Sequence, residues 1–249
     1  MEPPIYLSVI IPAYNEESRL PGTLKSVLGY LESRSYGSEV ILVDDGSTDG
    51  TAAFVESVRP ETRIPITLIK NEGNRGKGFS VRRGLLAGRG KVRLFTDADL
   101  STPITEFEKM RDLLDGGRDV VIGSRGMAQS EVLVHQAWYR ETMGKTFNLL
   151  VRLIAMGGIH DTQCGFKAFS AEFVERVCPH LQIDGWAFDV EMLYLARACG
   201  YRIEEVPIRW RNNDNTRVDA VLDSTRMFLE LLRIRWMDFT GRYRSLRAR

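Results

Sequence analysis

Several features are scarce in this sequence, and each scarcity narrows what the protein can be. Its three cysteines are odd in number and lack metal-ligand spacing, which favours a reducing compartment over a disulfide-bonded secreted domain. The net charge is only +1, so we expect no nucleic-acid partner. It contains no signal peptide and no apolar run of about 18 residues, so no segment is expected to span a membrane.

What remains is the composition of an ordinary globular protein. Of its 249 residues, 43% are hydrophobic and 27% are charged, which is enough to build a sizeable core. The sequence shows no repeat, low-complexity tract or linker. One domain is therefore the simplest expectation, although the length also allows two small ones.

Short β-branched runs alternate with helical patterns in the first half of the chain. Strands are predicted at 7–11, 40–43, 66–69, 92–96 and 120–122. This alternation predicts an α/β fold with a mostly parallel sheet and helices on both faces. Polar or glycine residues follow each predicted strand: Asn15-Glu16, Asp44-Asp45, Asn71, Asp97-Asp99 and Gly123-Ser124-Arg125. Because ligands bind beyond the carboxyl ends of such strands, the pattern predicts a nucleotide site.

The alternation weakens after residue 130. Here we expect a helix over 131–156, a turn and short strand over 161–169, and a helix over 188–199. A strand over 203–210, broken by Pro207, and a helix over 222–236 complete the prediction.

The most informative motif is the carboxylate pair Asp97 and Asp99 at the end of a predicted strand. Alternate residues of a strand point the same way, so both carboxylates would be directed at one point. Hard divalent cations take oxygen ligands, and Mg²⁺ is commonly held by one or two carboxylates and substrate phosphates. The pair therefore indicates a metal that holds a phosphorylated substrate. A pair of solvated loop or cap carboxylates is the alternative.

Two other polar segments of the first half allow two interpretations each. Asp44 and Asp45 can accept hydrogen bonds from a base or ribose, but Asp-Gly-Ser-Thr-Asp-Gly is also ordinary turn chemistry. Arg75-Gly76-Lys77-Gly78 offers backbone amides and a cation to phosphates, yet it lacks the Walker and dinucleotide-binding spacings.

Two segments of the second half are equally open. Residues 161–167 place a carboxylate, an amide, a thiol and a cation around a glycine turn. A nucleophilic Cys164 would need a histidine to activate it, and no pattern places one. Residues 186–191 carry two acids at a helix start, where favourable N-terminal charge is the simpler explanation.

Together these motifs resemble family 2 glycosyltransferases of GT-A fold. The matching segments are Pro12–Glu16, Val43–Thr51, Asp97–Asp99, Gly123–Arg125, Asp161–Lys167 and Trp186–Glu191, in the order of that family. The last two look most like the dolichyl-phosphate β-glucosyltransferase branch, and less like the dolichyl-phosphate mannose synthase branch. The resemblance runs from about residue 7 to about residue 236 and implies a GT-A (Rossmann-like) single domain.

The resemblance also implies residue roles. The donor site would contain Pro12, Tyr14, Glu16, Asp44, Asp45, Lys77, Asp97 and Ala98, and Asp99 with Asp97 would hold Mg²⁺ or Mn²⁺. Asp161 matches the proposed catalytic carboxylate, and Arg125 and Arg140 match arginines that bind the acceptor phosphate. Arg217 stands where the family usually has a lysine. Gln163, Lys167 and Asp189 are further site candidates.

The implied reaction is inverting transfer of a hexose from a nucleotide sugar to a polyprenyl phosphate. UDP-glucose and a dolichyl or undecaprenyl acceptor are expected. We expect residues 1–125 to bind the donor, residues 126–236 to carry the acceptor site, and residues 237–249 to form a basic tail. A GDP-mannose-dependent mannose synthase, a glycosyltransferase with a non-lipid acceptor, a nucleotidyltransferase and a non-catalytic nucleotide-sugar-binding module are the alternatives.

A membrane surface is a further expected partner, because a polyprenyl chain stays in the bilayer. The eukaryotic branch has an amino-terminal anchor that this sequence lacks, so we expect a peripheral protein on the cytoplasmic face. The amphipathic helices at 143–156 and 222–236 would lie at the interface with the arginines that follow them: Arg233, Arg235, Arg242, Arg244, Arg247 and Arg249. Core-facing helices and a solvated tail are the alternative.

Overall fold

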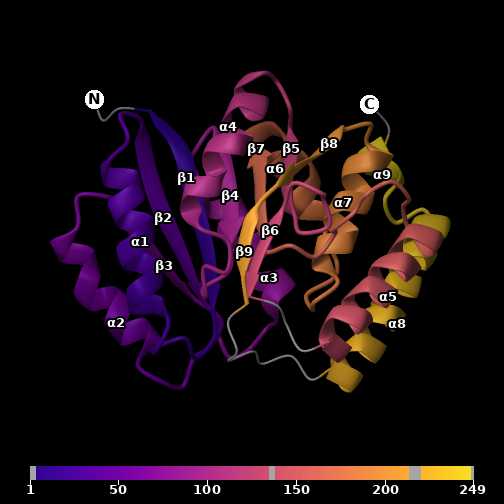
Figure 1. The fold of residues 1–249 in the computed structure, drawn as a ribbon, viewed down its shortest axis with the longest axis horizontal. Helices are drawn as coiled ribbons and strands as arrows, with labels where there is room; N and C mark the ends of the chain where they lie inside the picture. The colour runs from indigo at the N-terminus through magenta and orange to yellow at the C-terminus, as the bar shows by residue number, and fades with distance from the viewer. Residues whose placement is uncertain (1–3, 135–137, 213–219, 248–249) are drawn as a thin grey trace.

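A seven-stranded sheet organises the molecule, whose residues 4–134, 138–212 and 220–247 are described by a computed structural model (Figure 1). Its strand order is β3-β2-β1-β4-β7-β5-β8. The strands are β1 (Ile5–Ala13), β2 (Gly37–Asp44), β3 (Ile66–Lys70), β4 (Val92–Thr96), β5 (Val120–Ser124), β7 (Phe166–Ser170) and β8 (Ile203–Pro207). The mixed α/β fold and mostly parallel sheet predicted from the sequence are confirmed.

Strand β7 is the exception to the parallel arrangement, because it runs antiparallel to both β4 and β5. Its reversal leaves β4 and β5 pointing the same way, so the carboxyl ends of β1–β5 share one edge of the sheet. It also places the start of β7 at that edge. Residues 161–165, which precede β7, therefore lie among the loops that follow the parallel strands.

Two hydrophobic cores lie on the two faces of the sheet. Alternate residues of β1 divide between them: Ile10 belongs to one core, whereas Val9 and Ile11 belong to the other. Helices α1 (Leu20–Glu32), α2 (Thr51–Val58) and α4 (Phe107–Asp115) cover the Val9 face. Helices α3 (Lys77–Ala87), α6 (Ala171–Val177) and α7 (Phe188–Ala198) cover the Ile10 face.

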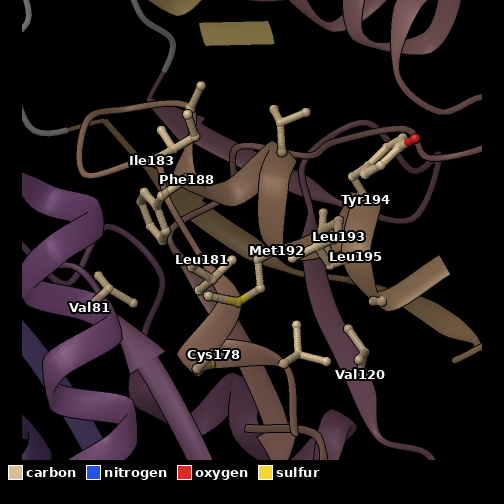
Figure 2. Close-up of a cluster of buried hydrophobic side chains, with 14 of the residues drawn as sticks. Val81, Val120, Cys178, Leu181, Ile183, Phe188, Met192, Leu193, Tyr194 and Leu195 are labelled. Carbon is tan, nitrogen blue, oxygen red and sulfur yellow. The ribbon is translucent and has the colours of Figure 1, made fainter. Parts of the chain in front are cut away.

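Figure 2 shows part of the second core, where Val81 of α3 and Phe188 and Met192 of α7 gather around Leu181. Three short 3₁₀ turns complete the connections: η1 (Arg59–Glu61), η2 (Ile104–Glu106) and η3 (Cys178–His180). The helix expected to open at Pro103 begins as η2 and continues as α4.

The helix predicted over 131–156 is wrong at its start. Residues Glu131–Val134 form strand β6, which pairs with β9 (Arg209–Arg211), and helix α5 covers Trp138–Ile154. The sequence Glu-Val-Leu-Val alternates half-buried valines with exposed neighbours, which is a strand pattern. Glu131 N–H donates to Ile208 O at 3.0 Å, so a distant segment fixes this conformation.

The break expected at Pro207 is present. Strands β8 and β9 lie on either side of Ile208 and belong to different sheets. Because proline has no N–H to give to a ladder, it sits at the end of β8 rather than inside a strand.

Helices α5 and α8 (Ala220–Phe239) pack together at one end of the molecule, beyond α7 (Figure 1). Each buries one side in the Ile10 core, through Phe147 and Val151 of α5 and Leu231 and Ile234 of α8. The short helix α9 (Arg244–Arg247) follows, and Tyr243 and Leu246 are buried in the same core. No helix in the described parts of the chain is both long and apolar enough to cross a membrane.

Candidate active site

The loops after β1 and β2 are joined by hydrogen bonds at the carboxyl edge of the sheet. Asn15 adopts a left-handed backbone (φ 54°), and its Oδ1 accepts the Thr48 N–H at 2.7 Å. Asp44 Oδ1 accepts the Ser47 N–H at 3.1 Å. These bonds fix the two loops relative to each other before any ligand binds. Asn and Asp suit such turns because their side chains mimic backbone acceptors.

Asp45 holds the glycine-rich turn, residues 73–78, against the end of β2. Its Oδ1 accepts the Arg75 N–H and its Oδ2 accepts the Gly76 N–H, both at 2.9 Å. Asn71 Nδ2 also donates to Oδ1, at 2.6 Å. The carboxylate is buried and its oxygens are engaged with the protein. Asp45 therefore shapes the turn that carries Lys77, and its predicted closeness to the nucleotide pocket is compatible with that task.

Lys77 and Asp97 form an ion pair at the centre of the edge. Lys77 Nζ lies 2.7 Å from Asp97 Oδ1 and 5.1 Å from the ring centre of Trp186. Burial lowers the pKa of Lys77, but the nearby carboxylates of Asp97, Asp189 and Asp99 raise it by more, so the group stays charged. The edge is thus strongly negative, and a protein ammonium group partly neutralises it.

Asp97 and Asp99 are suited to hold a divalent cation. Asp97 Oδ2 faces Gly165, where an added Cβ would come within 1.8 Å of it. Asp99 Oδ1 accepts the Ser101 N–H at 2.9 Å. Among the described residues no cluster of three or more metal-ligating side chains forms, so the chain offers at most two carboxylates here. That fits a Mg²⁺- or Mn²⁺-type ion completing its shell with substrate phosphates.

Asp161 and Arg125 form a second, more buried pair. Arg125 Nε and Nη2 donate to Asp161 Oδ2 and Oδ1 at 2.7 and 3.0 Å, and the Arg125 N–H also donates to Oδ2 at 3.0 Å. Burial raises the pKa of Asp161, but the guanidinium and the hydrogen bonds outweigh it and bring the pKa to about 2. Asp161 is therefore ionised at neutral pH and is a weak base. The Trp210 ring lies 5.3 Å from the Arg125 guanidinium carbon.

A third pair lies beneath these residues. Lys167 is fully buried, and its Nζ donates to Asp189 Oδ1 at 2.7 Å and to the Cys164 carbonyl. The bond to Cys164 ties residues 161–165 to the start of α7. Burial raises the pKa of the Cys164 thiol to about 12, so this cysteine is protonated and unsuited to act as a nucleophile.

The structure brings together three alternating charge pairs: Lys77 with Asp97, Lys167 with Asp189, and Arg125 with Asp161. Pro12 and Ala98 are placed at the same edge, at the ends of β1 and β4, where the Ala98 carbonyl accepts the Thr23 hydroxyl at 2.6 Å. Tyr14 is partly exposed, and Gln163 N–H donates to Asp161 Oδ1 at 3.2 Å.

Three predicted residues have a different standing. Glu16 makes a two-point ion pair with Arg19, with both contacts at 2.6 Å, in this structure. Arg140 belongs to α5, but its side chain is outside the described part, and Arg217 lies outside the described residues altogether.

Sequence reasoning missed three residues that support the site. Trp186 and Trp210 lie against the cations of Lys77 and Arg125. Glu205 of β8 accepts the N–H groups of His160 and Asp161, at 2.9 and 3.1 Å. Trp186 stood inside a motif already singled out, whereas Glu205 and Trp210 are brought in by sheet pairing alone.

Comparison with known proteins identifies the family. A family model described as glycosyl transferase family 2 matches residues 8–178, more than half of the chain. The chain belongs to glycosyl transferase family 2. A dolichyl-phosphate beta-glucosyltransferase of Dictyostelium discoideum is 38% identical over 248 residues, covering 95% of this chain and 76% of the relative. The human protein of that name is 35% identical and covers 98% of this chain and 79% of its own length. The family and branch predicted from the motifs are confirmed.

Solved structures show the same fold. Glucosyl-3-phosphoglycerate synthase from Mycobacterium tuberculosis, in complex with Mn²⁺, UDP-glucose and phosphoglyceric acid, has a TM-score of 0.70 and 21% identity. The match covers 92% of this chain and 79% of that one. Mannosyl-3-phosphoglycerate synthase from Rubrobacter xylanophilus has a TM-score of 0.67 and 19% identity, covering 96% and 75% of the two chains. The fold of this family 2 protein is therefore GT-A.

Proposed function

We propose that this family 2 glycosyltransferase transfers glucose, with inversion, from UDP-glucose to a polyprenyl phosphate at a membrane surface. The observation that carries the proposal is the 35–38% identity to dolichyl-phosphate beta-glucosyltransferases over nearly the whole chain. The acceptor's prenyl chain is dolichyl or undecaprenyl.

The donor side of the proposed reaction uses the first half of the chain, residues 1–125. Asp99 and Asp97 hold Mg²⁺ or Mn²⁺, which neutralises charge on the departing nucleoside diphosphate when bound. Lys77 supplies a second cation beside the diphosphate, after exchanging Asp97 for a phosphate oxygen. Pro12, Tyr14, Glu16 and Asp44 line the nucleotide pocket. A UDP-glucose and Mn²⁺ complex of a protein with this fold supports the choice of donor and metal class.

The acceptor side uses Arg125, with Arg140 and Arg217 as its proposed partners. A guanidinium carries five N–H donors, and Arg125 spends the Nε donor and one Nη2 donor on Asp161. The remaining donors suit the oxygens of a phosphate monoester. Such a monoester has a second pKa near 6 and is largely dianionic at neutral pH. With a pKa of about 2, Asp161 orients Arg125 rather than removing a proton.

The membrane side of the proposal rests on α5 and α8, where large apolar side chains are exposed on the surface: Leu149, Leu153, Leu229, Leu232, Trp236 and Phe239. Phe239 is 81% exposed and Leu153 is 74% exposed. Exposed arginines accompany them at 233, 235, 242 and 244. Apolar insertion next to basic residues is the chemistry of interfacial helices on anionic lipid. The same exposed residues make a peripheral, cytoplasmic-face location our proposal for this protein.

A donor and acceptor screen tests the proposed reaction. The protein is mixed with Mn²⁺, one nucleotide sugar and one acceptor, and release of nucleoside diphosphate is measured. We expect release from UDP-glucose only with a short polyprenyl phosphate. Release with GDP-mannose would point to a mannose synthase. Release from UDP-glucose with phosphoglyceric acid and no lipid would contradict the proposed acceptor.

Vesicle binding tests the membrane surface separately. We expect Trp236→Ser/Phe239→Ser to sediment with phosphatidylglycerol vesicles at least about tenfold less than the wild type, since burying each aromatic contributes about 1.5–3 kcal/mol. Leu86→Ser, which removes an exposed leucine of α3, is the matched control. Removing the tail would be a poorer test, because Tyr243 and Leu246 are buried in the core. Equal sedimentation of the double variant would exclude this surface.

A further inference from the structure

Residues 182–187, here called the bridging loop, connect η3 to α7 and touch the glycine-rich turn directly. The Asp184 carbonyl accepts the Gly78 N–H at 2.8 Å and the Phe79 N–H at 3.2 Å. A Cβ added at Gly76 would lie 2.4 Å from the same carbonyl oxygen. The two backbones are thus in contact, and the start of α3 cannot shift without moving the bridging loop.

The bridging loop also sets the surroundings of Lys77. Trp186 belongs to this loop, and its ring lies 5.1 Å from Lys77 Nζ. Figure 2 shows Ile183 near Phe188, and both belong with Val81 of α3 to one buried cluster. Movement of the loop would therefore change both the amide groups and the cation that the turn presents to the proposed diphosphate.

The opposite side of the bridging loop is held by helix α8. Glu230 accepts the Ala187 N–H through Oε2 at 3.1 Å. A Cβ added at Gly185 would lie 2.5 Å from Glu230 Oε1, so the carboxylate packs against the loop where no side chain intervenes. Glu230 is on the same helix as the exposed Trp236 and Phe239, two to three turns earlier.

A second carboxylate supports the same loop from below. Glu191 is fully buried and accepts the N–H groups of Gln182 and Ile183 at 2.9 and 2.8 Å. The hydroxyl of Tyr243, which follows α8, donates to Glu191 at 2.6 Å. The bridging loop thus depends on two residues of the C-terminal region, one contacting it directly and one through Glu191.

We propose that Glu230 is a positioning residue for the donor: it fixes the bridging loop, which in turn fixes the glycine-rich turn and Lys77. The seating of α8 on the domain thereby sets the affinity for the nucleoside diphosphate. This inference rests on the proposed function only in taking the glycine-rich turn as the diphosphate site. It extends that function by coupling the helix proposed to meet the membrane to donor binding. Such coupling is reciprocal, so a bound nucleotide also holds α8 in place.

The test is calorimetric binding of UDP with Mn²⁺ to folded, full-length variants. Glu230→Ala should raise the Kd about tenfold, because the Ala187 N–H loses a charged acceptor. In assays the KM for UDP-glucose should rise equally while kcat stays within about twofold, since the bound ground state and transition state lose the same contact. Glu230→Gln keeps an acceptor for Ala187 and should restore the Kd to within about twofold of the wild-type value.

Gly185→Ala approaches the same contact from the other side. The new methyl group displaces the Glu230 carboxylate and should raise the UDP Kd several-fold, without altering α8 itself. Glu204→Ala, which removes a surface partner of Arg118, is the control and should bind UDP like the wild type. A Kd for Glu230→Ala within twofold of the wild type would overturn the inference.

This outcome is independent of the acceptor. UDP binding is measured without lipid, so a failure to glucosylate polyprenyl phosphate would refute the proposed function and leave the positioning result standing. If the wild type binds GDP with Mn²⁺ in place of UDP, the variants are compared with GDP.

Discussion

The donor and acceptor sides of this site are assembled in different ways. On the donor side, side chains such as Asn15, Asp44 and Asp45 bond to backbone N–H groups of nearby turns. On the acceptor side, buried pairs of opposite charge, Arg125 with Asp161 and Lys167 with Asp189, join segments far apart in the sequence. The donor side is thus a set of shaped loops, whereas the acceptor side is a small network of charges. Substitutions on the two sides should consequently fail in different ways.

The largest effect is expected on the donor side, from removal of the proposed metal ligand Asp99. Asp99→Ala should lower kcat/KM about a thousandfold, since metal stabilisation of the leaving diphosphate is worth several kcal/mol. Mn²⁺ binding in the presence of UDP, followed by electron paramagnetic resonance, should weaken in parallel. Asp115→Ala, a surface carboxylate near Tyr6, is the control. Unchanged Mn²⁺ binding would remove Asp99 from the metal site.

Next in size is a stability effect on the acceptor side. Lys167→Met should lower the free energy of unfolding by about 3–5 kcal/mol, because it leaves the Asp189 carboxylate buried without its partner. Lys167→Met/Asp189→Leu removes both charges and should recover most of that loss. Urea denaturation measures both variants. A double variant as unstable as the single one would show that the charges themselves are needed.

Asp161 should show a smaller effect, confined to turnover and to acid stability. Asp161→Asn should lower kcat about a hundredfold and leave UDP binding near the wild-type value, because only the acceptor arginine loses its anchor. Near-normal turnover would exclude Asp161 from the reaction.

The pH dependence of Asp161 gives a second measurement. Its folded pKa of about 2 lies below the ordinary 3.8, so the stabilisation is complete above about pH 4 and is lost as the pH falls towards 2. The wild type should therefore exceed Asp161→Asn in unfolding free energy at pH 5 by about 2 kcal/mol more than it does near pH 2. A difference independent of pH would show that Asp161 is not held ionised by Arg125.

The smallest effect returns to the donor side. Asn71→Ala removes one of several hydrogen bonds to Asp45, and the backbone bonds from Arg75 and Gly76 remain. The KM for UDP-glucose should rise only about two- to fivefold, the worth of about one hydrogen bond, with kcat unchanged. A loss as large as that of Asp161→Asn would mean that the two sides are assembled more alike than the contacts indicate.

The same contrast explains what could be predicted from the sequence. The strands, the shared carboxyl edge and the donor residues follow from local patterns, because hydrophobic periodicity and turn chemistry act within a few residues. The resemblance of the later motifs supplied Asp161 and Arg125, but not their mutual ion pair. The placing of Trp210 and Glu205 escaped prediction because β8 and β9 bring them in through pairing with distant strands. Strand β6 was mistaken for helix for the same reason.

The antiparallel strand β7 has a consequence for how this fold can diversify. It enters the sheet from the edge where the donor loops end, so the segment before it, residues 161–165, faces the site while its own chain connections leave on the opposite side. Recombination could exchange this short segment between relatives as a cassette, leaving the donor loops in place. The requirement at its border is steric: Gly165 must stay bare for the Asp97 carboxylate to keep its position.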